Sequence, residues 1–125
     1  MKPHWVVLAA LVALSGRAFS ATPVEELEAR YQRAISTAEG LSYEMKAVQA
    51  FWGNAQFMRE CAPPNAPVAD PLTIYVVIEP SGVISDYVIV PDSKVATCIT
   101  KHTRDRALPP PPSNYTLKIE LKFTN

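Results

Sequence analysis

The chain has 125 residues, of which 48% are hydrophobic and 19% charged, and its formal net charge is zero. This length suits one globular domain and is too short for two. Phosphate-driven nucleic-acid binding needs clustered lysine and arginine, and the sequence has no basic block, so we set that class of function aside.

The first twenty residues have the pattern of a cleaved signal peptide. A short positive start is followed by an unbroken apolar run of ten residues, Trp5 to Leu14. Ala18 and Ser20 are small residues at the positions that signal peptidase recognises, which predicts cleavage between Ser20 and Ala21. The alternative is a retained anchor, but ten helical residues span only about 15 Å of a hydrocarbon core about 30 Å thick. We therefore expect a periplasmic mature chain with no stable membrane span.

Export changes the interpretation of the two cysteines, Cys61 and Cys98. In an oxidising compartment a lone pair is most simply a disulfide. The alternatives are a redox-active pair, which usually has close spacing such as CxxC, or two buried thiols. A disulfide closing this loop would stabilise the fold by roughly 3–4 kcal/mol through the entropy of the unfolded chain.

Residues 22–60 are predicted to be helical. Thr22 is a candidate N-cap, Pro23 suits the first helical position, and Glu25 would complete a capping box. We expect this helix to end at Gly40 and a second to run from about Ser42 to Glu60. The apolar face of the second helix would contain Met45, Val48, Phe51, Trp52, Ala55 and Met58. Three arrangements stay open: packing on the open face of a sheet, extension away from it, or dimerisation.

The pattern changes to strands after a stiff connector, residues 61–71, which contains four prolines. Residues 72–79 and 83–90 are rich in β-branched side chains and flank the turn Pro80-Ser81-Gly82, which predicts a hairpin.

A short helix is predicted next, with Asp92 or Ser93 as its cap. Its inward face would hold Val95, Cys98, Ile99 and His102, which would bring Cys98 toward Cys61. The four prolines 109–112 end this helix, and we interpret them as a rigid strap back to the sheet; a docking motif for a proline-binding partner is the alternative.

The last run, residues 115–123, alternates strictly. Tyr115, Leu117, Ile119, Leu121 and Phe123 face one way, and Thr116, Lys118, Glu120 and Lys122 face the other. Such alternation predicts one buried face and one face in water.

These elements predict an α+β fold in which N-terminal helices precede a three-stranded antiparallel β-β-α-β sheet. The expected strand order is 2-1-3, and one helix covers the apolar face. The final strand would be an edge with unpaired main-chain groups along one side.

Residues 61–125 resemble the C-terminal domain of the TonB and TolA energy-transducer family. The match includes the turn at Gly82, the run ISDYVIV after it, a helix that ends near Leu108, the proline strap and the closing strand LKIELKF. The placement of Cys98 resembles TonB-like variants with a paired cysteine. We expect the chain to differ from the family in having neither a retained anchor nor a long proline-rich spacer, so we do not predict harvesting of the proton gradient.

The resemblance implies a binding mode in which the sheet accepts a partner's strand at its edge. The candidate partner-binding residues are Tyr115, Thr116, Lys118, Glu120 and Lys122. The expected partner is a protein of the periplasm or envelope, with a homodimer also possible.

No convincing catalytic or metal-binding constellation is present, and we predict neither a cofactor nor enzymatic activity. His102 with Asp92 and Ser93 could be assembled into a triad only on paper, because all three belong to one short helix and its cap and no nucleophile-elbow motif accompanies them. The sequence therefore predicts a non-catalytic periplasmic protein-binding module. The alternatives are a periplasmic inhibitor or immunity protein that neutralises a toxin or a cell-wall hydrolase, an assembly factor that self-associates through residues 22–60, and an enzyme.

Overall fold

The computed structural model describes residues 22–124, so the predicted leader and its cleavage site between Ser20 and Ala21 lie outside the described residues. Three helices come first: α2 (Val24–Ala34), α3 (Ala38–Trp52) and the short α4 (Met58–Cys61). They are followed by β1 (Leu72–Ile78), β2 (Ile84–Val90), α5 (Lys94–Thr103) and β3 (Tyr115–Leu121).

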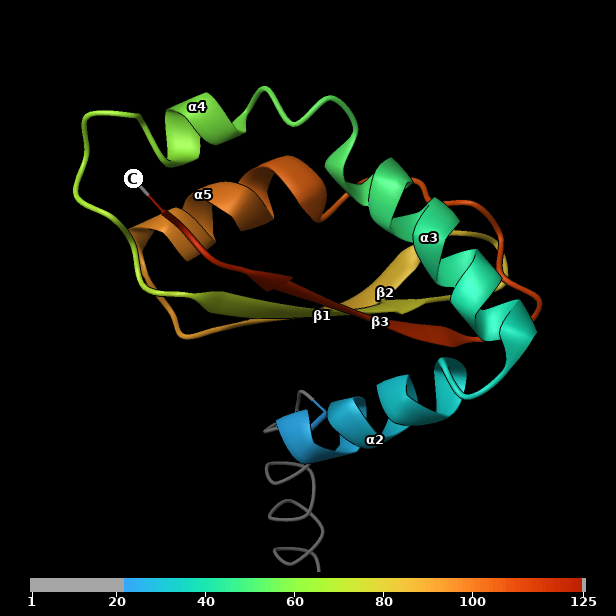
Figure 1. The fold of residues 1–125 in the computed structure, drawn as a ribbon. Helices are drawn as coiled ribbons and strands as arrows, with labels where there is room; N and C mark the ends of the chain where they lie inside the picture. The colour runs from blue at the N-terminus through green and yellow to red at the C-terminus, as the bar shows by residue number, and fades with distance from the viewer. Residues whose placement is uncertain (1–21, 125) are drawn as a thin grey trace, which may run out of the picture.

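The three strands form one antiparallel sheet in the order β2-β1-β3 (Figure 1). β1 lies in the centre, with the hairpin partner β2 on one side and the closing strand β3 on the other. The predicted α+β class, the hairpin and the strand order are therefore confirmed.

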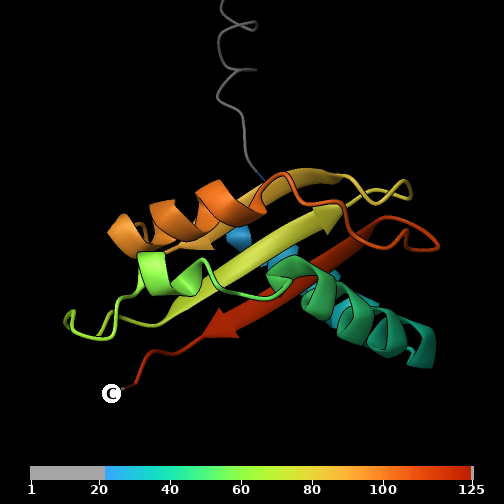
Figure 2. The same ribbon diagram turned by 90° about the horizontal axis from the view of Figure 1, so that it is seen from above.

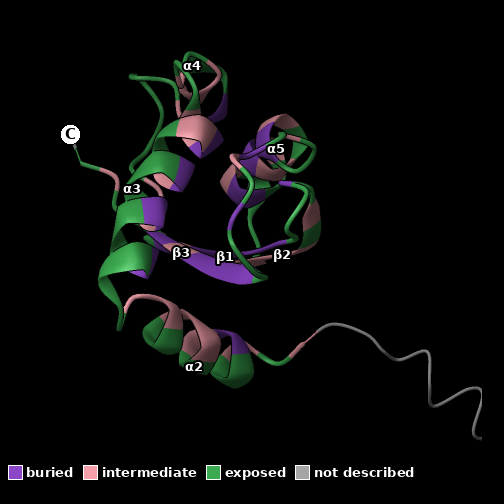
Figure 3. Cartoon of the chain, turned by 90° about the vertical axis from the view of Figure 1, so that its right-hand side faces the viewer, coloured by how far each residue is buried: buried purple, intermediate pink, exposed green. Residues whose placement is uncertain are grey.

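Helices cover both faces of the sheet, as Figure 3 shows with the sheet edge-on. α2 lies on one face, whereas α3, α4 and α5 lie on the other. The sequence predicted a helix over one face and left the position of residues 22–60 open. Both faces need a cover because successive side chains of β1 alternate between them and are almost all buried.

The larger core lies between the sheet and the three helices α3, α4 and α5. Ile74, Val76 and Ile78 of β1 are fully buried there, against Phe51 of α3 and Ile99 of α5. Full burial of such a side chain contributes roughly 1.5–3 kcal/mol. The helical segment and the sheet consequently share one core.

A smaller cluster holds α2 on the opposite face. Leu27 is fully buried against Tyr75 and Val77 of β1, and Val24 and Val88 pack around them. Only one side chain of α2 is buried completely, so this helix is attached through a much smaller apolar contact than α3 or α5.

Gly40 does not end the first helix, contrary to the prediction. α2 already ends at Ala34, and Gly40 lies in the first turn of α3, where Thr37 caps the helix by accepting a hydrogen bond from the Gly40 N–H at 3.0 Å. A Cβ at Gly40 would lie 1.7 Å from the Ala34 carbonyl oxygen. The glycine is therefore needed for the close approach of α2 and α3.

Other details of the helix predictions are also wrong. α2 begins at Val24 with Pro23 at the N-cap and no side-chain cap, so the capping box of Thr22 and Glu25 is not formed. The predicted second helix is interrupted after Trp52 by Gly53, which has a positive φ of 58°. The inward face of α3 contains Gly40, Tyr43, Ala47 and Phe51, and it leaves Met45 70% exposed because Met45 lies on another side of the helix.

The predicted disulfide joins Cys61 at the end of α4 to Cys98 in α5, with the two Cα atoms 5.4 Å apart. The two helices lie over the same face of the sheet (Figure 2). α5 begins as expected, with the Ser93 hydroxyl accepting a hydrogen bond from the Ala96 N–H at 3.0 Å. The bridge therefore attaches the stretch after α3 to the helix that covers the hairpin.

The proline strap returns the chain to the sheet and is itself packed. The Tyr43 hydroxyl donates a 2.6 Å hydrogen bond to the Pro109 carbonyl, and Pro111 is buried. Just before the strap, the Leu108 N–H donates to the Gly82 carbonyl at 3.0 Å. Gly82 has a positive φ of 91°, and a Cβ there would lie 2.2 Å from the Leu108 carbonyl oxygen, so the turn and the strap require glycine at this position.

We expect Gly40→Ala to lower the free energy of unfolding by roughly 1–3 kcal/mol, because the added methyl group must push α2 and α3 apart. The measurement is urea unfolding followed by circular dichroism. The control is Ser42→Ala, an exposed position one residue beyond the first turn of α3. Equal stability of the two variants would contradict the close approach of these helices.

Candidate functional site

The outer edge of β3 has main-chain groups without partners. Directly after β1, the Glu79 N–H donates to the Val83 carbonyl at 2.9 Å. Main-chain groups alternate in direction along a strand, so the odd-numbered residues of β1 also direct theirs toward β2. The β3 residues opposite odd-numbered β1 residues are Thr116, Lys118 and Glu120, and their N–H and C=O groups point away from β1. No main-chain hydrogen bond within residues 22–124 joins this edge to another segment.

The outer edge of β2 is protected, in contrast to that of β3. The register with β1 shifts at Val77, where Ser85 is the extra residue of a β-bulge. The Asp86 carboxylate accepts a hydrogen bond from the Tyr87 N–H at 3.0 Å, and Pro91 follows the end of the strand. A bulge, an occupied N–H and a terminal proline are devices that oppose strand addition. β3 is therefore the more available edge.

The polar face of β3 is largely covered by α2, which corrects the expectation that this face lies in water. Thr116 is only 4% exposed, and the side chain of Lys118 is 18% exposed. Glu120 and Lys122, beyond the reach of α2, are exposed as predicted. These two of the four polar side chains are therefore accessible to a partner, although a Glu120 carboxylate oxygen also lies 3.9 Å from Lys118 Nζ.

Lys118 is held under α2 by an ion pair and by aromatic rings. Its Nζ lies 2.8 Å from Glu28 Oε1, and the same oxygen accepts a hydrogen bond from the Tyr75 hydroxyl. The ammonium also lies 5.7 Å from the centre of the Tyr31 ring and 5.9 Å from that of Tyr75, within cation–π range. This cluster joins α2 to both β1 and β3.

The contacts in this cluster shift the pKa values of Glu28, Tyr75 and Lys118. Hydrogen bonds from Lys118 and then from Tyr75 lower the pKa of Glu28 from 4.5 to about 2. Burial, with the hydrogen bond to Glu28, raises the pKa of Tyr75 to about 12. The hydrogen bond to Glu28 raises the pKa of Lys118. The ion pair is therefore fully charged across the neutral range.

The connection from α2 to α3 passes around the edge of β3 near its first residues (Figures 1 and 3). The Tyr31 hydroxyl of α2 lies 3.4 Å from Glu44 of α3, and the Tyr115 hydroxyl donates to the Gly40 carbonyl at 2.9 Å. The rings of Tyr43 and Tyr115 pack edge to face, 4.7 Å between centres. The start of β3 is therefore flanked by helices, and the open part of the edge begins near Lys118.

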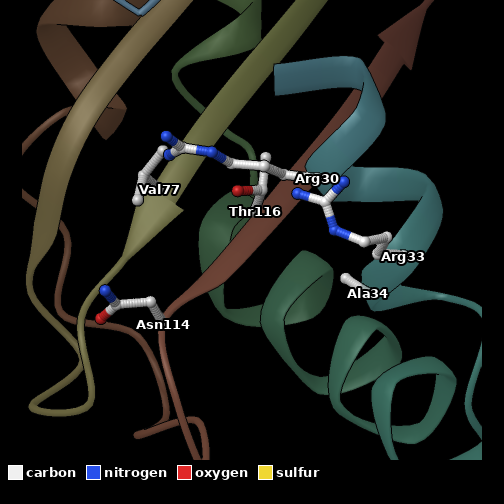
Figure 4. A pocket seen from close by; sticks show the side chains of 6 residues that line it. All are labelled: Arg30, Arg33, Ala34, Val77, Asn114 and Thr116. Atoms are coloured by element: carbon white, nitrogen blue, oxygen red, sulfur yellow. The ribbon is translucent and has the colours of Figure 1, made fainter. Parts of the chain in front are cut away.

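A hollow of about 460 Å³ lies beside the flanked end of β3 (Figure 4). Its lining residues are Arg30, Arg33, Ala34, Val77, Asn114 and Thr116. Arg30 is already paired with Glu26, one turn earlier on α2. The hollow follows from the way α2 lies across the sheet, and no sequence motif indicated it.

The residues of the hypothetical triad are not brought together. Ser93 is the N-cap of α5 and His102 lies near its other end, nine positions later, which is about 13 Å of helical rise. The Ser93 hydroxyl caps the helix, and His102 Nε2 lies 3.3 Å from Glu60 Oε2. Neither side chain is placed to activate the other.

Comparison with protein-family models, with curated proteins and with solved structures found no match for this chain. The resemblance to the TonB and TolA domain stays a prediction. Within residues 22–124, no helix combines the length and the apolar character needed to cross a membrane.

We expect acid to weaken the attachment of α2 through Glu28. The folded pKa of this carboxyl lies below its ordinary value, so its stabilising contribution is complete above about pH 4.5 and is lost as the pH falls toward 2. Glu28→Gln should therefore be less stable than the parent at pH 6 and closer to it at pH 2.5, by urea unfolding at both pH values. The difference in stability between Lys118→Met and the parent should likewise be smaller at pH 2.5 than at pH 6, since Lys118 is the main cause of the lowered Glu28 pKa. If each variant differed from the parent by the same free energy of unfolding at pH 6 and at pH 2.5, the ion pair would be contradicted.

Proposed function

We propose that this chain is a non-catalytic protein-binding module that accepts an extended strand of a partner on the outer edge of β3. The observation that carries the proposal is the contrast between the two edges of the sheet. β2 has a bulge and an occupied N–H, whereas β3 has free main-chain groups at Lys118 and Glu120 and no bulge. Strand addition uses such an edge, with main-chain hydrogen bonds supplying the affinity.

The open part of the edge defines where a partner binds. Helices flank β3 at Tyr115, so the partner's strand lies along the second half of β3 and the residues that follow it. In Figure 2 no described helix lies beside this half on its outer side. Glu120 and Lys122 are exposed there and carry opposite charges, so they are suited to select a partner strand with the complementary order of charges.

The rigidity of the edge supports the same function. β3 pairs with β1 over its whole length, and its apolar side chains Leu117 and Ile119 are buried in the core. On the other face α2 fixes Lys118 through Glu28. A strand that is ordered before binding loses little conformational entropy when the partner adds. We place the module in the periplasm because of its predicted leader, and its partner is accordingly a periplasmic or envelope protein.

The test is a pair of substitutions at one exposed position. Glu120→Pro removes an N–H that points away from β1, so it should leave the sheet intact while it abolishes capture of a partner from a periplasmic extract. Glu120→Ala, the matched control, keeps the N–H and should retain capture within about threefold. Thermal unfolding checks that both variants are folded. Equal capture by folded Glu120→Pro and Glu120→Ala would overturn the proposal.

Hydrogen exchange gives a second readout with the captured partner. The amides of Lys118 and Glu120 should become protected when it binds, whereas those of Leu117 and Ile119 are already protected by β1. Protection confined to the helices would instead assign binding to another surface.

A further inference from the structure

The end of α4 and the middle of α5 bring together three side chains that bind metal ions. The Cys61 and Cys98 sulfurs and a ring nitrogen of His102 all lie within 4.8 Å of one another. A carboxylate oxygen of Glu60 lies 3.3 Å from His102 Nε2. In the structure described here the two sulfurs form the disulfide, so neither is available as a thiolate.

We propose that the dithiol form of the Cys61–Cys98 pair, together with His102, binds one thiophilic divalent metal ion such as zinc. This form exists in every newly made chain before the disulfide is closed. The Glu60 carboxylate, which already contacts the imidazole, is the candidate fourth ligand. The inference is independent of the strand-binding edge, which lies on β3.

The donor set and its spacing fit zinc. Zinc takes thiolate sulfur at about 2.3 Å and imidazole nitrogen at about 2.0–2.1 Å in tetrahedral sites, which places neighbouring ligand atoms roughly 3.5–3.8 Å apart. The three atoms observed here already lie within 4.8 Å of one another. Rotations of the side chains therefore suffice, and the helices need not be rearranged.

The local structure orients these ligands. Cys98 and His102 are four residues apart on α5, so both project from one face of that helix. The Phe57 ring stacks on the imidazole, with centres 5.0 Å apart and planes 18° from parallel. The side chain of His102 is 28% exposed, which leaves the ion a route from solvent. The contact with Phe57 limits the rotation of the imidazole ring and so holds its nitrogen near the two sulfurs.

Metal and disulfide exclude each other at this site. When the ion binds, each thiol loses its proton and two protons are released. On oxidation, each sulfur gives one electron to an oxidant such as a small-molecule disulfide, which leaves as two thiols while the new S–S bond forms. Neither cysteine then keeps a thiolate, so the ion is released.

The test uses the purified chain in reduced and oxidised forms, without oxygen, titrated with zinc against a chromophoric chelator. The reduced chain should take up one zinc per chain and the oxidised chain none. His102→Ala should weaken binding at least tenfold, and Cys98→Ser should weaken it further. Lys101→Ala, at an exposed neighbouring position of α5, is the matched control and should bind as the parent does. Cobalt in place of zinc should give the absorption of a tetrahedral site with thiolate ligands.

Equal zinc uptake by the reduced and oxidised chains would overturn the inference, and so would an unchanged affinity in His102→Ala. If reduction unfolds the chain, near-ultraviolet circular dichroism is used to measure whether zinc refolds it. Zinc must then restore the spectrum of the folded protein in the parent but not in His102→Ala. A reduced chain whose spectrum zinc does not restore likewise refutes the site. Addition of glutathione disulfide to the loaded chain should release the metal as the disulfide closes.

Discussion

The central strand β1 is buried on both of its faces, and this burial decides where the helices lie. Ile74, Val76 and Ile78 need one apolar layer, and Tyr75 and Val77 need another on the opposite side. Three strands are too few to cover themselves by curling into a closed barrel, so helices must supply both layers. α3 and α5 cover the face with the larger core, and α2 covers the face with the smaller cluster. Because α2 buries little apolar area, the Glu28–Lys118 ion pair contributes to its attachment.

Much of the sheet could be predicted from the sequence, because its signals are local. The hairpin follows from two β-branched runs around Gly82, and the buried face of β3 follows from its alternation. The second layer had a local signal too, since Ile74 to Ile78 of β1 form a continuous apolar run, which is typical of a strand covered on both faces. The polar side chains of β3 gave the opposite indication, because Thr116 and Lys118 suggest a face exposed to solvent. A lysine can nevertheless bury its aliphatic stem and place its charge against a carboxylate from a helix distant in sequence.

The helix boundaries could not be derived in the same way, because their causes are not local. Gly40 is typical of a helix end by composition, but its role is to admit the Ala34 carbonyl, a contact that exists only after α2 and α3 fold back on each other. Met45 was wrongly placed on the inward face for a related reason, since Met45 and Phe51 are equally apolar and only the position of the sheet distinguishes them. Phe51, Val48 and Trp52 of the same predicted face do pack in the core. The edge strand of the candidate site and the disulfide could be predicted from the sequence, whereas the burial of Lys118 beneath α2 could not.

The path of the chain also explains why one edge of the sheet is open and the other closed. β2 ends the sheet beneath α5, and its bulge and the Asp86–Tyr87 contact protect an edge that no helix within residues 22–124 covers. β3 has no bulge, but helices flank its first residue, since the Tyr115 hydroxyl donates to the Gly40 carbonyl of α3. The contact of Tyr31 with Glu44 joins α2 to α3 at this end of the sheet. The helices therefore block strand addition at the start of β3, and the rest of its outer edge stays open. Beyond that point, among the residues that the structure describes, the charges of Glu120 and Lys122 oppose pairing with an arbitrary strand. Such charges are selective, because a strand with the complementary order of charges is attracted rather than repelled.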